Sequence, residues 1–152
     1  MAVRQVELKD IKSVIGQELG VSDWHLVTQQ EINAFANATH DHQWIHVDVE
    51  RAKKESPFGG PVAHGYYTLS LAPYLMSQIW SVQGVKMGVN YGLNRLRFPA
   101  PVLAGKRVRA RATLNNVEDV PGGIQVTVGV TFEVEGNDKP VCVAEGVYRY
   151  YA

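Results

Sequence analysis

Several features that would define a class of protein are scarce in this sequence of 152 residues. Its one cysteine, Cys142, excludes an intramolecular disulfide, and its apolar neighbours are typical of a strand in which a free thiol packs as a small hydrophobe. No apolar run reaches the roughly 18 residues that a membrane-spanning helix requires. Residues 1–10 mix charged side chains with valines and lack the apolar core of a signal peptide. We therefore expect a cytoplasmic protein with no membrane partner.

An excess of charge of either sign is also absent. The sequence holds 15 lysines and arginines against 15 aspartates and glutamates, so its formal net charge at pH 7 is zero. Without surplus positive charge no long-range field attracts nucleic acid, and we expect no nucleic-acid partner. A chain of this length, with 45% hydrophobic residues, can bury one core and is short for two. We therefore expect a single domain over residues 1–152.

Two short helices are predicted in the first half of the chain. Thr28 and Glu31 have the spacing of a capping box, and the apolar residues that follow recur at helical spacing to about Thr39. Asp48 is placed to cap a second helix. Between residues 56 and 61, glycine and proline are so dense that an irregular segment is expected.

A long apolar helix is predicted over residues 65–80. This stretch has no charged residue, so a helix here must be buried on most sides. Pro73 lies within it and predicts a kink or the loss of one backbone hydrogen bond.

The second half of the chain has the pattern of an antiparallel sheet. Apolar and polar residues alternate over residues 107–114 and 124–135, so each segment predicts a strand with one dry face. Residues 119–123 and 136–140 contain the glycine, proline and aspartate of turns, which predict hairpins. Two further strands are expected, over about residues 84–98 and 141–151.

These elements together predict an α+β fold. An antiparallel sheet with one apolar face can cover a long, buried central helix by wrapping around it, which is the hot-dog fold. The chain is too short for two hot-dog units, so we expect a second copy to supply the other wall of a binding site. This predicts a homodimer.

The densest group of ionisable side chains lies at residues 39–48, where three histidines and two aspartates occur within ten residues. Asp41 and His46, five positions apart across a turn, can both point at one water molecule. Such a pair is suited to activating water, which is a poor nucleophile at neutral pH. The same two residues can instead be a turn aspartate and a hydrogen-bonded core histidine.

A metal site is a third interpretation of this segment. Its ligands would be His40, His42, His46 and Asp48. The one-residue spacing of the first two suits neither a helix face nor the usual zinc spacings, so we expect no metal.

Residues 35–48 resemble the signature of MaoC-like dehydratases and (R)-specific enoyl-CoA hydratases, in which Gly-Asp-x-Asn-Pro-Ile-His-x-Asp follows a helix. Residues 60–65 resemble that family's entry into the central helix, and residues 98–102 with Gly105 resemble its strand-end motif. The resemblance spans roughly residues 20–150.

Two departures from the signature stand out. His40 occupies the position where the family usually has glycine, which can affect the local backbone or the pKa of the neighbouring carboxylate. Gln43 and Trp44 stand where Asn-Pro is commonest, in a form that is similar to a single-hot-dog subgroup often labelled nodulation-protein-N-like.

The resemblance implies a hydro-lyase of fatty-acid metabolism that adds water to trans-2-enoyl-CoA and gives (R)-3-hydroxyacyl-CoA. Asp41 would be the general base, and His46 would hold the water and relay its proton toward C2 of the substrate. The backbone N–H of Gly65 is the candidate donor to the thioester oxygen, although this glycine can instead serve close packing. No cofactor is expected, since coenzyme A enters as part of the small-molecule acyl-CoA substrate.

Further residues are candidates for contact with this substrate: Gln43, Trp44, His64, Tyr66, Asn90 and Arg97. His64 is also interpretable as a buried structural histidine bonded to backbone, and Asn90 as a solvent-facing strand residue. Tyr66 and Tyr67 are expected along the acyl tunnel. Arg97 belongs to a group of cationic residues that can bind the phosphates of coenzyme A, although an ordinary charged sheet face has the same composition.

Two other classes of function remain open. Acyl-CoA thioesterases share the hot-dog fold, but they usually place a carboxylate on the central helix, and residues 65–80 contain no aspartate or glutamate. A non-catalytic acyl-thioester-binding protein is the second alternative, and His40 is the residue that favours it.

Overall fold

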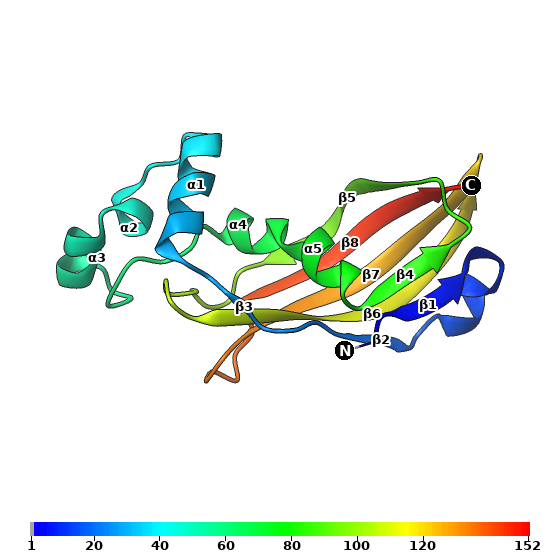
Figure 1. Cartoon of the computed structure of the whole chain (residues 1–152), viewed down its shortest axis with the longest axis horizontal. Coiled ribbons are helices and arrows are strands. Elements are labelled where there is room, and N and C mark those ends of the chain that lie inside the picture. The colour runs from blue at the N-terminus through cyan, green and yellow to red at the C-terminus, as the bar shows by residue number, and fades with distance from the viewer. Residues whose placement is uncertain (1) are drawn as a thin grey trace.

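The computed structural model describes residues 2–152 and consists of a long curved sheet with helices along one face (Figure 1). The first part of the chain forms β1 (Arg4–Glu7), the 3-10 helix η1 (Leu8–Val14), β2 (Glu18–Val21), β3 (His25–Leu26), α1 (Gln29–Thr39), α2 (Trp44–Val47) and α3 (Val49–Glu55). The remainder forms α4 (Gly65–Ser70), α5 (Ala72–Ser77), β4 (Trp80–Gln83), β5 (Met87–Arg97), β6 (Arg107–Val120), β7 (Gly123–Val134) and β8 (Cys142–Tyr151).

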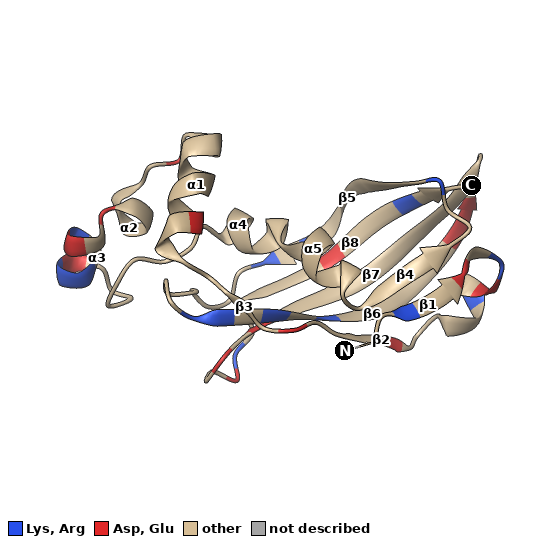
Figure 2. Cartoon of the chain, viewed as in Figure 1, with Lys and Arg blue, Asp and Glu red and all other residues tan. Residues whose placement is uncertain are grey.

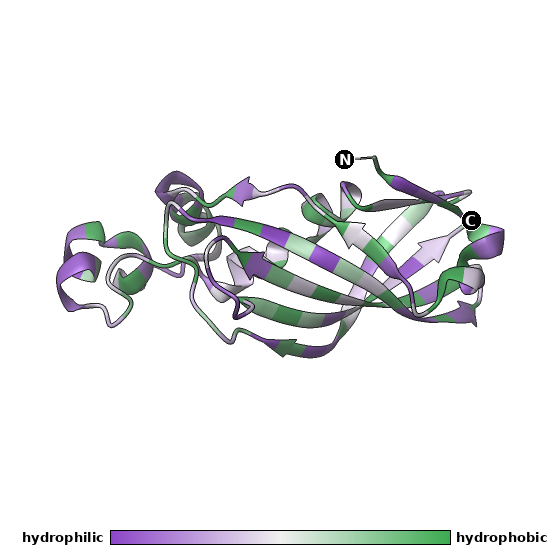
Figure 3. Ribbon diagram, turned by 90° about the horizontal axis from the view of Figure 1, so that it is seen from below, coloured by the Kyte–Doolittle hydropathy of each residue, from purple (hydrophilic) through white to green (hydrophobic). Residues whose placement is uncertain are grey.

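The main sheet has the order β2-β6-β7-β8-β5, with β3 also paired to β6, and all of these pairings are antiparallel. The predicted strands and both predicted hairpins are therefore confirmed. The β6–β7 hairpin closes through Pro121 and Gly122, whose φ of 81° explains the glycine. Buried residues alternate strictly along β7, and bands of high and low hydropathy alternate along the strands in Figure 3.

The core lies between the dry face of the sheet and the helical pair α4–α5. Phe132 and the buried valines of β7 form one side of a single cluster, and Leu75 and Met76 of α5 form part of the other. Burying each such side chain contributes about 1.5–3 kcal/mol of transfer free energy, so this layer holds the helices against the sheet.

The central helix is shorter than predicted. The expected helix over residues 65–80 is divided at Leu71 into α4 and α5, because Pro73 sits in the first turn of α5 and cannot donate a backbone hydrogen bond to α4. It ends at Ser77, and Trp80 begins β4, which pairs in parallel with β1. That pair of four-residue strands was not predicted, since neither is long enough to show a periodic pattern.

Both predicted N-caps are present. The Thr28 side chain accepts the Glu31 backbone N–H at 3.1 Å, and the Asp48 side chain accepts the Arg51 backbone N–H at 3.1 Å. The helices α1, α2 and α3 project beyond the end of the sheet (Figure 1). The short helix α2, which was not predicted, carries His46.

Charged side chains of both signs are interspersed on the fold. Figure 2 shows acidic and basic residues together on α3 and a row of basic residues on β6. Arg107 and Arg109 of that row pair with Glu135 and Glu133 of the chain segment opposite. No helix among residues 2–152 combines the length and the apolar character that crossing a membrane takes.

Candidate active site

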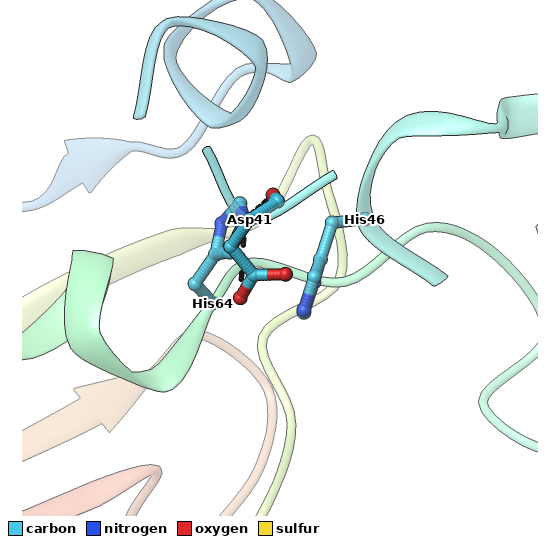
Figure 4. Close-up of side chains that lie close together, drawn as sticks. All are labelled: Asp41, His46 and His64. Atoms are coloured by element: carbon cyan, nitrogen blue, oxygen red, sulfur yellow. Dashed lines mark hydrogen bonds and ion pairs between the residues drawn. The ribbon is translucent and has the colours of Figure 1, made fainter. Parts of the chain in front are cut away.

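Three ionisable side chains converge near the start of α4. Asp41 lies in the turn after α1, His46 lies on α2, and His64 immediately precedes α4. One carboxylate oxygen and one nitrogen from each ring all lie within 4.8 Å of one another (Figure 4). The fold thus brings the predicted pair together and adds His64 to it.

The turn at His40 directs Asp41 toward the histidines. His40 caps the C-terminus of α1 in the left-handed conformation, with φ 65° and ψ 18°. A residue other than glycine pays about 1–2 kcal/mol in this region, which explains why the family usually has glycine here. Asp41 follows, with one carboxylate oxygen accepting the Gln43 backbone N–H at 3.3 Å and 53% of its side chain exposed. Solvent therefore reaches the carboxylate.

The ring of His46 is buried and held in one tautomer. Its Nδ1 lies 2.7 Å from the Val62 carbonyl oxygen, which can only accept, so Nδ1 carries the proton and Nε2 carries the lone pair. The Gln29 side chain donates to the His46 carbonyl at 2.7 Å and fixes the backbone. Burial lowers the pKa of His46, and this effect outweighs the opposite effect of the bond to Val62. The ring is therefore neutral at neutral pH.

His64 is enclosed between aromatic rings. Its Nε2 donates to the Asp41 backbone carbonyl at 3.0 Å, as its interpretation as a buried, backbone-bonded histidine predicted. Its ring stacks on His46, with centroids 3.9 Å apart and planes at 23°, and Phe35 packs on it at 4.9 Å.

The three side chains are of types that bind transition metals, but their arrangement does not suit a metal centre. A histidine binds metal through a lone pair in the ring plane, and two nearly parallel stacked rings cannot aim such lone pairs at one ion. The Nε2 proton of His64 is also engaged by a carbonyl. Of the set considered from the sequence, His40 and His42 are exposed, and Asp48 caps α3.

A cavity of about 310 Å³ adjoins this group and is lined by Ile45 and Gly65, the chain neighbours of His46 and His64. Gly65 is needed for packing, because an added Cβ would lie 2.8 Å from the ring of Phe98. Among the residues described, its backbone N–H has no hydrogen-bond acceptor. The packing and donor interpretations of Gly65 are therefore compatible.

Comparison with known proteins identifies the family of this chain. A family model described as the MaoC like domain matches residues 10–136. The chain belongs to the MaoC-like dehydratase family. The resemblance seen in residues 35–48 is thereby confirmed, and the site lies within the matched region.

Relatives of the MaoC-like family align along nearly the whole chain. The 3-hydroxyacyl-thioester dehydratase Z of Mycobacterium tuberculosis is 55% identical over 144 residues, covering 94% of this chain and 95% of the relative. Nodulation protein N of Rhizobium meliloti is 44% identical over 147 residues, covering 95% and 91%.

Solved structures confirm the hot-dog fold. The monoamine oxidase regulatory protein from Archaeoglobus fulgius superposes with a TM-score of 0.77 at 25% identity, covering 100% of this chain and 99% of that one. An (R)-hydratase from A. caviae involved in PHA biosynthesis gives a TM-score of 0.71 at 24% identity, covering 88% and 94%. The protein is a dehydratase of the MaoC type, and this family supports a hydro-lyase activity.

Three of the other candidate residues of this MaoC-like chain lie on or beside α2 and α4, the elements next to the central group. Gln43 is exposed, and Trp44 of α2 lies under the guanidinium of Arg51 at 4.2 Å. Tyr66 is 65% exposed and meets Phe98 edge to face. The packing of these residues leaves them accessible to a bound molecule.

Asn90 and Arg97 lie on β5 and not in the convergent group. Asn90 lines two cavities of about 380 and 330 Å³ beside α5, which share Pro73, Asn90 and Tyr148. Arg97 is exposed, and its guanidinium donates to the Leu96 carbonyl at 2.7 Å.

Neither Tyr66 nor Tyr67 lines the cavities beside α5, contrary to expectation. Tyr67 lines a separate cavity of about 350 Å³ together with Glu31 and Phe35. It is buried, and its hydroxyl donates to Glu31 at 2.9 Å, with His25 3.1 Å from the same carboxylate oxygen. The reason is that Tyr67 faces α1, where Phe35 and Glu31 contact it, whereas Tyr66 is turned by about 100° around the helix and is exposed. Burial, with a further effect of Glu31, raises the pKa of Tyr67, which keeps the hydroxyl a donor.

Proposed function

We propose that this protein is an (R)-specific enoyl-CoA hydratase and 3-hydroxyacyl-CoA dehydratase, which adds water to trans-2-enoyl-CoA. One observation carries the proposal: the Asp41 carboxylate and the lone pair of His46 Nε2 are two hydrogen-bond acceptors that converge beside an apolar cavity. A water molecule has two protons to donate, and donation to both acceptors leaves an oxygen lone pair free to attack carbon.

Asp41 and His46 hold the proton of the attacking water between the two steps of the reaction. As the water oxygen bonds to C3, Asp41 takes one of its protons, and the electrons of the double bond move onto the thioester oxygen. The proton then returns to C2 through His46 as the electrons move back, so the product has gained H at C2 and OH at C3. Because the enzyme ends in its starting protonation state, the same groups serve the reverse dehydration.

Charge on the thioester oxygen requires a donor during this step. The Gly65 N–H has no acceptor among residues 2–152, and Gly65 lines the cavity, which makes this N–H our candidate. A fixed amide donor stabilises a developing oxyanion more strongly than water does, because it is already oriented and needs no reorganisation during the reaction.

We infer that the remaining candidates contact other parts of the substrate. Gln43, Trp44 and Tyr66 belong to the segments that carry the reacting groups, and Asn90 lies in the apolar cavities along α5 that suit an acyl chain. Arg97 has no acidic partner within the described chain, whereas Arg107 pairs with Glu135, so Arg97 is the better candidate for a coenzyme A phosphate. No cofactor takes part in this scheme.

We also propose that the protein works as a homodimer in the cytoplasm. Strand β5 is an edge of the sheet and is exposed along nearly its whole length, including Met87, Tyr91 and Leu93. An unpaired, apolar edge of this length is a site for strand pairing with another chain. A second copy there would also cover the cavities beside α5.

The purified protein with crotonyl-CoA or a medium-chain enoyl-CoA tests the proposal. We expect the ultraviolet absorbance of the enoyl thioester to fall while no free thiol is released, and chiral analysis to find the (R)-3-hydroxy product. Thiol release would instead support a thioesterase, although α4 and α5 have no carboxylate and Glu31 is already engaged by Tyr67. Binding without turnover at every chain length would support the non-catalytic alternative.

A further inference from the structure

His64 contacts both members of the Asp41–His46 pair through different parts of one ring. Its Nε2–H donates to the backbone carbonyl of Asp41 at 3.0 Å, and its face stacks on His46 with centroids 3.9 Å apart. Its Nε2 is 4.0 Å from the nearer Asp41 carboxylate oxygen, beyond hydrogen-bond distance. The His64 ring therefore contacts the backbone carbonyl of Asp41 and the ring face of His46.

The position of His64 is itself fixed from several directions. Only 3% of the residue is exposed, and Phe35 of α1 packs on its ring at 4.9 Å. The preceding residue, Ala63, donates its backbone N–H to Val102 at 2.8 Å, and the His64 carbonyl accepts from the first turn of α4. The ring is thus held in place by the surrounding fold, and it contacts one residue of a turn and one of a four-residue helix.

Packing alone does not explain an imidazole at this position. The Nδ1 of His64 is buried and has no hydrogen-bond partner among residues 2–152. A buried polar atom without a partner destabilises the fold, so phenylalanine would fill the same space at lower cost. What phenylalanine lacks is the Nε2–H donor, and that donor is directed at Asp41.

We propose that His64 is a positioning residue, which aligns the Asp41 carboxylate and the His46 ring on one water molecule without contacting the substrate. This inference rests on the proposed hydratase function and gives His64 a role different from substrate binding. A displacement of about 1 Å in a reacting group is sufficient to lower a rate on the order of 100-fold, so alignment of this kind is measurable.

The stacking has an electrostatic consequence as well. The titratable groups that face His46 are Asp41 and His64, and His64 lowers the pKa of His46 while Asp41 raises it. Loss of the His64 imidazole should therefore move the pKa of His46 upward.

Two substitutions test the Nε2–H donor and the aromatic face of His64 separately. His64→Phe keeps the aromatic face and removes the donor, whereas His64→Gln places an amide N–H the same number of bonds from Cα as Nε2 and removes the face. For His64→Phe we expect kcat to fall by on the order of 10–100-fold with KM within about 3-fold of wild type. We expect His64→Gln to recover part of kcat, and the acid limb of the pH profile to move to higher pH in both variants.

Each result decides between roles. A normal kcat in His64→Phe overturns the proposal, and a raised KM with unchanged kcat shows that His64 binds substrate instead. Thermal unfolding of both variants separates loss of folded protein from loss of alignment. If wild type itself has no turnover, the hydratase function fails, and NMR titration of His46 in the two variants still tests whether His64 sets its pKa. An unchanged His46 pKa in both would then overturn the proposal.

Discussion

The site at Asp41 and His46 could be predicted only in part from residue type and spacing. Their types and spacing predict an acid–base pair, but the Nε2 lone pair of His46 exists at the site only because Nδ1 donates to Val62, 16 residues away in the sequence. The two segments are also joined by the Val62 backbone N–H, which donates to the Ile45 carbonyl at 3.0 Å, a pairing with no pattern in the sequence. The third member, His64, was predicted as a buried histidine, and its stacking on His46 depends on the same folding of distant segments.

Removing either member of the pair should remove most of the activity. We expect Asp41→Asn and His46→Gln each to lower kcat by about 10²–10⁴-fold, because each loses a proton acceptor. The exposed His42→Gln is the matched control and should keep wild-type kcat. Initial rates of loss of enoyl absorbance measure all three, and full activity in either of the first two variants would refute the assignment.

The lowered pKa of His46 predicts the pH dependence of activity and stability. Activity needs neutral His46, so the acid limb of kcat/KM should lie below the ordinary histidine pKa of 6.5. The unfolded chain binds a proton at higher pH than the folded one, so stability present above pH 6.5 should be lost as pH falls toward the folded pKa. Denaturant unfolding of wild type and His46→Gln over this range measures it; equal pH dependence in both would contradict it.

Substitutions of His40 test the backbone strain at the C-terminal end of α1. With φ at 65°, His40→Val should lower the free energy of unfolding by about 1–2 kcal/mol, because a β-branched residue resists this conformation. His40→Gly should be neutral or stabilise by up to about 1 kcal/mol, since relief of strain offsets the entropy of glycine. Denaturant midpoints of the two variants give the comparison, and a His40→Val protein as stable as His40→Gly would contradict the αL assignment.

At the scale of elements, patterns in the chain predicted most strands and helices correctly. The alternation in β6 and β7 and the caps at Thr28 and Asp48 are local properties, so they can be recognised without the fold. The elements that were missed are short ones whose partners lie far away, such as β1 on β4. The division of the central helix depended on where Pro73 falls within the turn, which periodicity does not define.

Substitutions at Gly65, the first residue of α4, test its packing against Phe98. Gly65→Ala should lower the free energy of unfolding by about 1–3 kcal/mol, because its Cβ would lie 2.8 Å from the Phe98 ring. A second substitution, Phe98→Leu, should recover much of that loss. Chemical denaturation of the single and double variants measures the coupling, and additive losses would show that the Phe98 contact is not the cause.

At the scale of the whole molecule, the exposed edge predicts self-association. Light scattering at micromolar concentration should give about twice the chain mass of 16.8 kDa, and a mass near 17 kDa would contradict a dimer. Leu93→Lys on β5 should shift the protein toward monomer and reduce activity, because a buried lysine opposes edge pairing. Ile15→Lys, at a similarly exposed apolar site outside β5, is the control and should remain dimeric.

The sequence by itself determined the α+β class, the four long strands β5 to β8, the family signature and the two residues proposed for catalysis, because all of these are local patterns of residue type and spacing. Only the tertiary structure decided the tautomer of His46, the stacking of His64 on it and the neighbourhood of the cavity. These depend on contacts between segments distant in the chain. Burial and hydrogen bonds in that enclosed site set the protonation state of a histidine, and no stretch of sequence contains that environment.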